Sequence, residues 1–146
     1  MAYEISPVSV WVGTLDDRPG ELARVLATLW RAGANLEFVS VRPDEYQLGS
    51  SALFVAPLEG PALAEAAAAV GLRTSKTLHV LRAVVPDRPG LLSDLAEELA
   101  EAGVNILGLT GTSLRGDSAL FLRFLGPEEL QLAAHVLRRR LTANGV

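Results

Sequence analysis

The most constraining feature of this sequence is an internal repeat. Asp17-Arg18-Pro19-Gly20 recurs as Asp87-Arg88-Pro89-Gly90, an offset of 70 residues (87 − 17). A later segment, Ser51-Ala52-Leu53-Phe54, recurs as Ser118-Ala119-Leu120-Phe121 at an offset of 67 (118 − 51). The three-residue difference falls in the Arg42–Gly49 connection, where a loop tolerates changes of length. Two matched blocks at nearly equal offsets predict two copies of one structural unit.

Within each copy, the hydrophobic periodicity predicts the order β-α-β-β-α. Apolar and polar residues alternate over Val8–Val12, which indicates a first strand, and Leu78–Val85 is its counterpart. An amphipathic helix follows each Asp-Arg-Pro-Gly segment and ends at Gly33 or Gly103, because glycine accepts the left-handed conformation past a helix end. The remaining strands are expected at Leu36–Arg42, Ser50–Ala56, Ile106–Arg115 and Ser118–Leu125, and the second helices begin at Pro61 and Pro127.

This order predicts an α+β fold with two ferredoxin-like (βαββα) units, at residues 1–74 and 75–146, each with helices on one face of an antiparallel sheet. Leu72–Thr77 is available as a fourth strand for the first unit, whereas the sequence after the last helix offers none to the second. We therefore expect an unpaired sheet edge, covered by packing of the two units side by side or by a homodimer.

Composition narrows the class of protein. Hydrophobic residues make up 49% and charged residues 21% of the 146, which is typical of a folded globular protein. The net charge of −4 gives no basic footprint for nucleic acid or for an anionic membrane. There is no cysteine, no signal peptide and no apolar segment long enough to span a bilayer, so we expect a cytoplasmic protein.

The spacing of Asp-Arg-Pro-Gly, an amphipathic helix, Ala-Gly-x-Asn and an apolar strand resembles the ACT domain, a family of small regulatory modules that bind amino acids. The resemblance extends over nearly the whole chain, twice, and implies a ligand at an interface between two units. The implied ligand-binding residues are Asp17, Arg18, Pro19, Gly20, Glu21, Leu22 and Asn35 in the first copy, and Asp87, Arg88, Pro89, Gly90, Leu91, Leu92 and Asn105 in the second. A serine-binding variant of the family has an imidazole where this chain has Leu15 and Val85, which argues against serine as the ligand.

The chemistry of these residues suits a zwitterion independently of the resemblance. A helix N-terminus offers N–H groups to a carboxylate, an aspartate accepts hydrogen bonds from an ammonium, and an asparagine amide donates and accepts. Glu21 would repel a bound carboxylate whereas Leu91 would not, so we favour the second copy. Both features also have structural interpretations: Asp, Pro and Gly dominate ordinary turns, and each asparagine directly follows a helix end.

No catalytic constellation is evident, because the sequence has no nucleophile elbow, no HExxH motif and no cysteine. The leading hypothesis is a non-enzymatic amino-acid-binding regulatory protein without cofactor or metal. The alternative is a regulatory subunit that docks on a metabolic enzyme without a ligand of its own. A third hypothesis, a small ferredoxin-like enzyme, lacks candidate catalytic residues.

Overall fold

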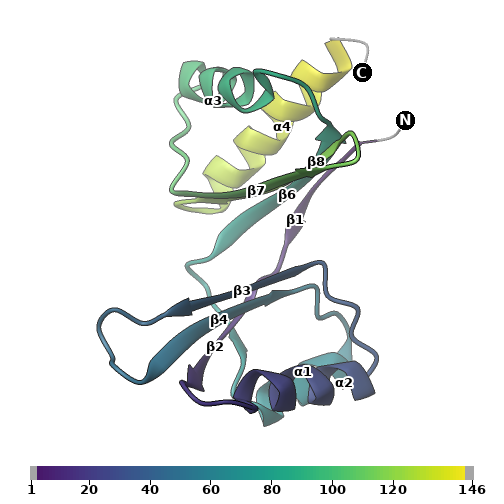
Figure 1. The fold of residues 1–146 in the computed structure, drawn as a ribbon. Helices are drawn as coiled ribbons and strands as arrows, with labels where there is room; N and C mark the ends of the chain where they lie inside the picture. Colours follow the sequence, from purple (N-terminus) through teal and green to yellow (C-terminus); the bar gives the residue numbers. More distant parts are fainter. Residues whose placement is uncertain (1–2, 144–146) are drawn as a thin grey trace. The chain divides into compact units, whose positions relative to one another are not determined.

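The computed structural model describes residues 3–143, which form two four-stranded antiparallel sheets and four helices (Figure 1). The predicted α+β class and the β-α-β-β-α order of each repeat are confirmed. In chain order the elements are β1 (Glu4–Val8), β2 (Trp11–Asp16), α1 (Glu21–Arg31), β3 (Phe38–Pro43), β4 (Ser50–Ala56), α2 (Pro61–Ala69), β5 (Arg73–Thr74), β6 (His79–Pro86), α3 (Leu91–Glu101), β7 (Gly108–Leu114), β8 (Asp117–Phe124) and α4 (Pro127–Ala143).

The N-terminal unit spans Ser9–Lys76 and has the strand order β3-β4-β2-β5. Helices α1 and α2 cover one face of this sheet (Figure 1). The helix-facing residues of β2 and β4 form its core with the apolar stripe of α1, which is why Leu53, Val55 and Leu29 are fully buried. The two-residue strand β5 pairs with β2 and supplies the fourth strand predicted over Leu72–Thr77.

The C-terminal unit combines β1 with the chain from Thr77 onward, in the strand order β1-β6-β8-β7. Helices α3 and α4 cover one face of this sheet (Figure 1). Phe124 of β8, Leu99 of α3 and Leu137 of α4 are fully buried in its core.

The N-terminal segment differs from the prediction. The expected strand over Val8–Val12 is two strands, β1 and β2, and β1 pairs antiparallel with β6 over five residue pairs, from Glu4 with Val84 to Val8 with Val80. The predicted boundary, which placed residues 1–74 in one unit, therefore changes, because β1 belongs to the other unit. This strand fills the edge expected to lie bare beside β6, so a missing strand no longer argues for a dimer.

The turns follow the sequence closely. Gly33 and Gly103 adopt φ values of 102° and 77° directly after α1 and α3, as the prediction of helix ends required. Arg115 and Gly116 form the two-residue connection between β7 and β8, with φ values of 56° and 86°. Two successive positive φ values match the right-handed twist of a hairpin, so β7 and β8 are joined by a tight two-residue turn.

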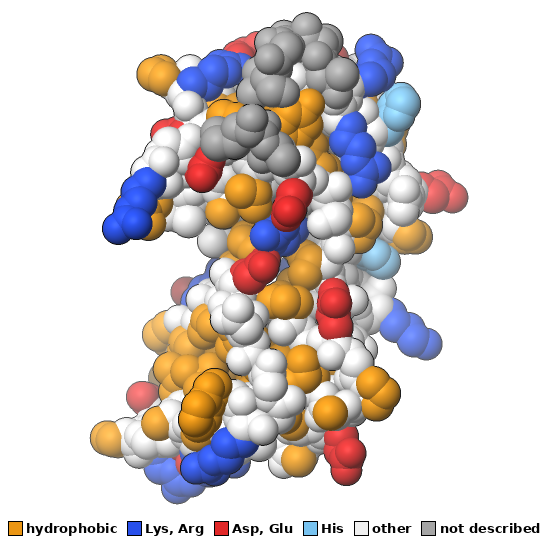
Figure 2. All heavy atoms as spheres, turned by 90° about the vertical axis from the view of Figure 1, so that its right-hand side faces the viewer, with side chains coloured by type: hydrophobic (Ala, Val, Ile, Leu, Met, Phe, Trp, Pro, Cys, Tyr) orange, Lys and Arg blue, Asp and Glu red, His pale blue; other side chains and the backbone are white. Residues whose placement is uncertain are grey.

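Several large hydrophobic side chains reach the surface among charged ones, on the face drawn in Figure 2 and elsewhere. On β7 and just before it, Leu107, Leu109 and Leu114 are about half exposed or more. Among residues 3–143, no helix has the length and the apolar character needed to cross a membrane.

Candidate ligand site

Both Asp-Arg-Pro-Gly loops connect the first strand of a repeat to its first helix and are fixed to the same place in their unit. The Asp87 N–H donates to the Gly116 carbonyl at 2.8 Å, and the Asp17 N–H donates to the Gly49 carbonyl at 2.8 Å. Each loop is thereby tied to the hairpin between the next two strands. The repeated sequence thus folds into a repeated backbone anchor.

In the C-terminal unit this anchor places the Asp87 carboxylate beside two hydroxyl groups. Ser118 Oγ donates to Asp87 Oδ1 at 2.8 Å, Ser113 Oγ donates to the same oxygen at 3.3 Å, and the two hydroxyl oxygens lie 2.8 Å apart. Ser118 is only 2% exposed and is the one buried polar side chain in the described part of the chain. Because buried polar groups need partners, this network holds the Asp87 carboxylate through Oδ1, while Asp87 itself remains exposed.

A cavity of about 250 Å³ opens beside this network. One side is the N-terminus of α3, which follows Gly90 and has no side-chain cap. The Leu91 N–H donates to the Arg88 carbonyl at 3.2 Å, so the N–H groups of Leu92 and Ser93 are the ones that can reach an anion. Gly90 has a φ of 81°, a conformation that disfavours side chains. The lining residues are Asp87, Arg88, Gly90, Leu91, Leu92, Ser93, Gly111, Thr112, Ser113, Ser118 and Leu120.

Arg88 lines this cavity, but its charge is already paired. Its guanidinium forms an ion pair with Asp94 in the first turn of α3. Arg140 of α4 lies 3.7 Å from the same carboxylate and 3.2 Å from Glu98. These contacts fix the loop against the two helices, which leaves the helix N-terminus as the main anion-binding feature of the cavity.

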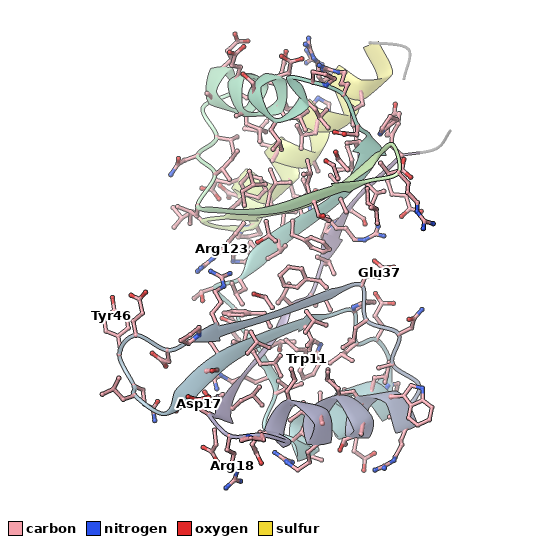
Figure 3. The ribbon with its side chains drawn as sticks, in the orientation of Figure 1. Trp11, Asp17, Arg18, Glu37, Tyr46 and Arg123 are labelled. Carbon is pink, nitrogen blue, oxygen red and sulfur yellow. The ribbon has the colours of Figure 1, made fainter. Side chains whose placement is uncertain are left out.

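The loop of the N-terminal unit carries a different set of charges, at the start of α1, where Figure 3 labels Asp17 and Arg18. The Glu21 carboxylate accepts hydrogen bonds from Arg18 at 2.9 Å and Arg24 at 3.3 Å, and Arg18 also lies 3.6 Å from Asp16. The bond from Arg18, with that from Arg24, holds the pKa of Glu21 below its usual range, and the same bond raises the pKa of Arg18. Glu21 therefore stays ionised at the helix end where a ligand carboxylate would bind.

We expect Glu21→Gln to remove a pH-dependent part of the stability of this unit. A carboxyl group whose pKa is lower in the folded protein than in the unfolded one, where it is ordinarily 4.5, stabilises the fold at pH values above that unfolded pKa. This stabilisation is lost as the pH falls through the folded pKa. The variant should melt below the unmodified protein at pH 7, and the two melting temperatures should converge in acid. Thermal unfolding followed from pH 7 down to pH 3 measures this, and a gap that widens in acid would contradict the assignment.

The predicted asparagines lie far from the aspartates of their own unit. The Leu107 N–H, two residues after Asn105, bonds to Arg123 at one end of β8, whereas Asp87 bonds to Gly116 beyond the other end. Gly116 and Arg123 are seven residues apart (123 − 116), and at about 3.3 Å per residue these ends are separated by roughly 23 Å. The N-terminal unit repeats this arrangement, since Glu37, two residues after Asn35, lies at the far end of β3 and β4 from Asp17 (Figure 3).

The remaining predicted residues fall into two groups. Pro89, Gly90 and Leu92 share the loop and first turn with Asp87, and Leu91 is buried at the base of α3. Their counterparts Pro19, Gly20 and Leu22 take the same places before and within α1, where Leu22 packs against the core. Each unit thus assembles one complete loop from the prediction and leaves its asparagine outside it.

Six residues that line the cavity were not among the predicted site residues: Ser93, Gly111, Thr112, Ser113, Ser118 and Leu120. Gly111, Ser113, Ser118 and Leu120 occupy positions of β7 and β8 on the face that the helices cover, and Ser113 and Ser118 are direct partners in the register of these strands. Alternate residues of a strand share a face. That period, counted from the turn at Arg115-Gly116, is the signal that puts both serines on the same face of the sheet.

Comparison with known proteins reveals a family match over part of the chain and a shared fold over nearly all of it. Residues 79–139 match the ACT domain family model, and no curated protein sequence matches the chain. A crystal structure of a protein from Bacteroides thetaiotaomicron is similar over 93% of this chain and 90% of its own, with 15% identity and a TM-score of 0.76. The ligand-free regulatory subunit of aspartate kinase from Thermus thermophilus is similar over 95% and 96%, with 14% identity and a TM-score of 0.63.

Aspartokinase III of Escherichia coli, in complex with lysine and aspartate, is similar over 97% of this chain but only 33% of its own, with 16% identity and a TM-score of 0.53. Identities this low establish a common fold and no more. The family match, however, contains the Asp87 loop, α3, β7 and β8, which are the elements that build the cavity. The C-terminal unit therefore matches the ACT domain family over residues 79–139, and the N-terminal unit repeats its ferredoxin-like fold.

Proposed function

We propose that this chain is a non-enzymatic regulatory protein that binds a free amino acid in the cavity of its C-terminal unit. The observation that carries the proposal is the position of Asp87, whose carboxylate lies beside an uncapped helix N-terminus in a cavity of about 250 Å³. The two features have opposite electrostatic preferences. The carboxylate attracts an ammonium, and the helix end attracts a carboxylate.

The other lining residues suit the rest of such a ligand. Leu91 and Leu120 present apolar surface, while Thr112 and Ser93 offer hydroxyl groups that both donate and accept. The cavity is small compared with the several hundred Å³ of a site for drug-sized molecules, which agrees with a ligand the size of an amino acid. Among the solved structures of this fold, one was captured with lysine and aspartate, which supports the ligand class.

A broad amino-acid screen with matched variants tests the proposal. The twenty amino acids are screened by thermal shift, and those that stabilise the protein are titrated by calorimetry. Asp87→Asn keeps the shape of the side chain and removes the charge that holds the ammonium. A hydrogen bond to a charged group contributes about 1.5–3 kcal/mol, so we expect affinity to fall roughly 10- to 100-fold.

Asp17→Asn is the matched control, because Asp17 has the same loop and the same backbone anchor in the N-terminal unit. We expect it to leave affinity unchanged. Circular dichroism confirms that both variants are folded. Absence of binding by every amino acid at millimolar concentration would remove the proposal.

We propose further that the binding protein is a homodimer in which the cavity meets Asn105 of a second copy. Within one unit Asp87 and Asn105 lie at opposite ends of the sheet, so they can contact one ligand only across an interface. A ligand that binds across an interface favours the assembled state. Sedimentation velocity with and without the amino acid should show the dimer and its strengthening, and a monomer under both conditions would contradict this assembly.

The second candidate function, docking on a metabolic enzyme, is favoured by the outer strand β7. This strand lies at a sheet edge, and Leu109 and Leu114 are 47% and 72% exposed. Edge strands with apolar side chains are templates for another chain. Co-purification of one enzyme from native extract, lost in Leu109→Asp/Leu114→Asp, would establish this function; retention by the variant would exclude this surface.

A further inference from the structure

The two repeats share a backbone but differ at the positions that shape the cavity. Strand register gives the correspondence: Gly111 is opposite Leu120 in the C-terminal unit, and Val41 is opposite Leu53 in the N-terminal unit. Leu120 and Leu53 are equivalent in the repeated Ser-Ala-Leu-Phe segment. Val41 therefore occupies the position of Gly111.

The exchange of glycine for valine changes the space beside the helix. A Cβ atom at Gly111 would lie 2.9 Å from Leu120 Cδ2, closer than real Cβ atoms approach their neighbours. Leu120 is 2% exposed and has little freedom to move. The cavity of the C-terminal unit thus depends on a glycine, and the N-terminal unit carries an isopropyl group at the same place.

The hydrogen-bond network differs in the same direction. Ser113 and Ser118 are opposite each other, and their counterparts in the N-terminal unit are Pro43 and Ser51. Proline has no hydroxyl group and cannot replace Ser113 as a donor. In the described part of the chain the Asp17 carboxylate has no hydrogen-bond partner, whereas Asp87 has two.

The charge at the helix end differs as well. The first residue of α3 is the buried Leu91, and the first residue of α1 is Glu21, held by Arg18 and Arg24. An ionised carboxylate at this position opposes a second carboxylate from a ligand. The first turn of α3 also holds an acidic residue, Asp94, but it lies three residues further along and is paired with Arg88. Space, hydrogen bonding and the charge at the first helical position therefore favour the C-terminal unit.

We infer that the chain has a single amino-acid site, in the C-terminal unit, and that Val41, Pro43 and Glu21 close the equivalent position in the N-terminal unit. Gly111 and Ser113 are the residues that distinguish the two copies. The N-terminal unit contributes fold and assembly without a ligand of its own. This inference rests on the proposed function and adds the number and the position of the sites.

Calorimetric stoichiometry on the full chain tests the inference. The probe is whichever of the twenty amino acids gives the largest thermal shift. We expect one ligand per chain, affinity reduced at least 10-fold in Asp87→Asn, and unchanged affinity and stoichiometry in Asp17→Asn.

The two proposals fail in different ways. Two ligands per chain, or one ligand whose binding is lost in Asp17→Asn and kept in Asp87→Asn, would overturn the single C-terminal site and leave amino-acid binding intact. No binding by any of the twenty would overturn both. If Asp87→Asn proves unfolded by circular dichroism, Ser113→Ala and its counterpart Pro43→Ala provide the same comparison, with loss of affinity expected only for the first.

Discussion

A chain that lacks residues 1–8 is expected to lose most of the stability of its C-terminal unit, although the deleted segment precedes the N-terminal unit in sequence. The deletion removes β1, which pairs with β6 over five residue pairs. Ile5 is 8% exposed and packs in the core with Leu81. Its carbonyl accepts a hydrogen bond from Arg138 of α4 at 2.7 Å. Truncation of one buried isoleucine to alanine costs about 2–5 kcal/mol, and loss of the whole strand should exceed that.

Hydrogen exchange measured by mass spectrometry locates the effect, because it reports each segment separately. We expect faster exchange in β6 and α4 and little change in β4. Trp11 and Trp30, the two tryptophans of the chain, both belong to the N-terminal unit, so their fluorescence follows that unit alone. Equal acceleration in both units would contradict the assignment of β1.

Two point variants in the same strand refine the result. Ile5→Ala removes the buried side chain of β1, and Ser6→Ala changes an exposed neighbour of similar backbone geometry. We expect a fall of about 2–5 kcal/mol in the free energy of unfolding for the first and almost none for the second. Similar effects of both would show that β1 contributes pairing without core packing.

The place of β1 could not be predicted from the sequence for a physical reason. Alternation over Val8–Val12 reports which residues share a face, but it says nothing about the strand beside them. The partner of β1 lies more than seventy residues away, and Ser9 and Val10 interrupt the strand without a glycine or proline between them. Pro7 is compatible with β1 because this strand is at a sheet edge. Long-range pairing of this kind depends on tertiary packing.

The candidate site shows the same division between local and long-range information. The loop at Asp87 and the start of α3 were predictable because both depend on a short motif and a helix period. Ser113 and Ser118 reach Asp87 only through the register of β7 with β8 and of β8 with β6. Asn105 was assigned to the site with Asp87 because the family resemblance implies a ligand between two units, and within one unit the strands carry the two residues to opposite ends of the sheet. Sequence spacing therefore identified the side of the cavity formed by the loop and the start of α3, and not the side formed by β7 and β8.

Gly111→Val is expected to abolish most ligand binding, because it gives the C-terminal unit the side chain that its repeat carries at Val41. The new Cβ atom would lie 2.9 Å from Leu120 Cδ2, in the wall of the cavity. Overpacking of this kind costs roughly 1–3 kcal/mol, and the added methyl groups also occupy ligand space. If this overpacking energy applies only to the ligand-bound protein, the affinity for the amino acid falls roughly 10- to 100-fold or more. Calorimetry with the best-binding amino acid measures the change.

Gly108→Val is the matched control in the same strand. A Cβ atom at Gly108 would lie 3.4 Å from Arg123 Cβ, near ordinary van der Waals contact, and Gly108 does not line the cavity. Valine suits a strand, so this variant should fold and bind as the unmodified protein does. Because Gly111 and Gly108 face opposite sides of the sheet, the pair separates the effect of filling the cavity from that of adding a branched side chain to β7. Equal loss of affinity in both would show that β7 supports binding through its backbone, and unchanged affinity in Gly111→Val would place the ligand elsewhere.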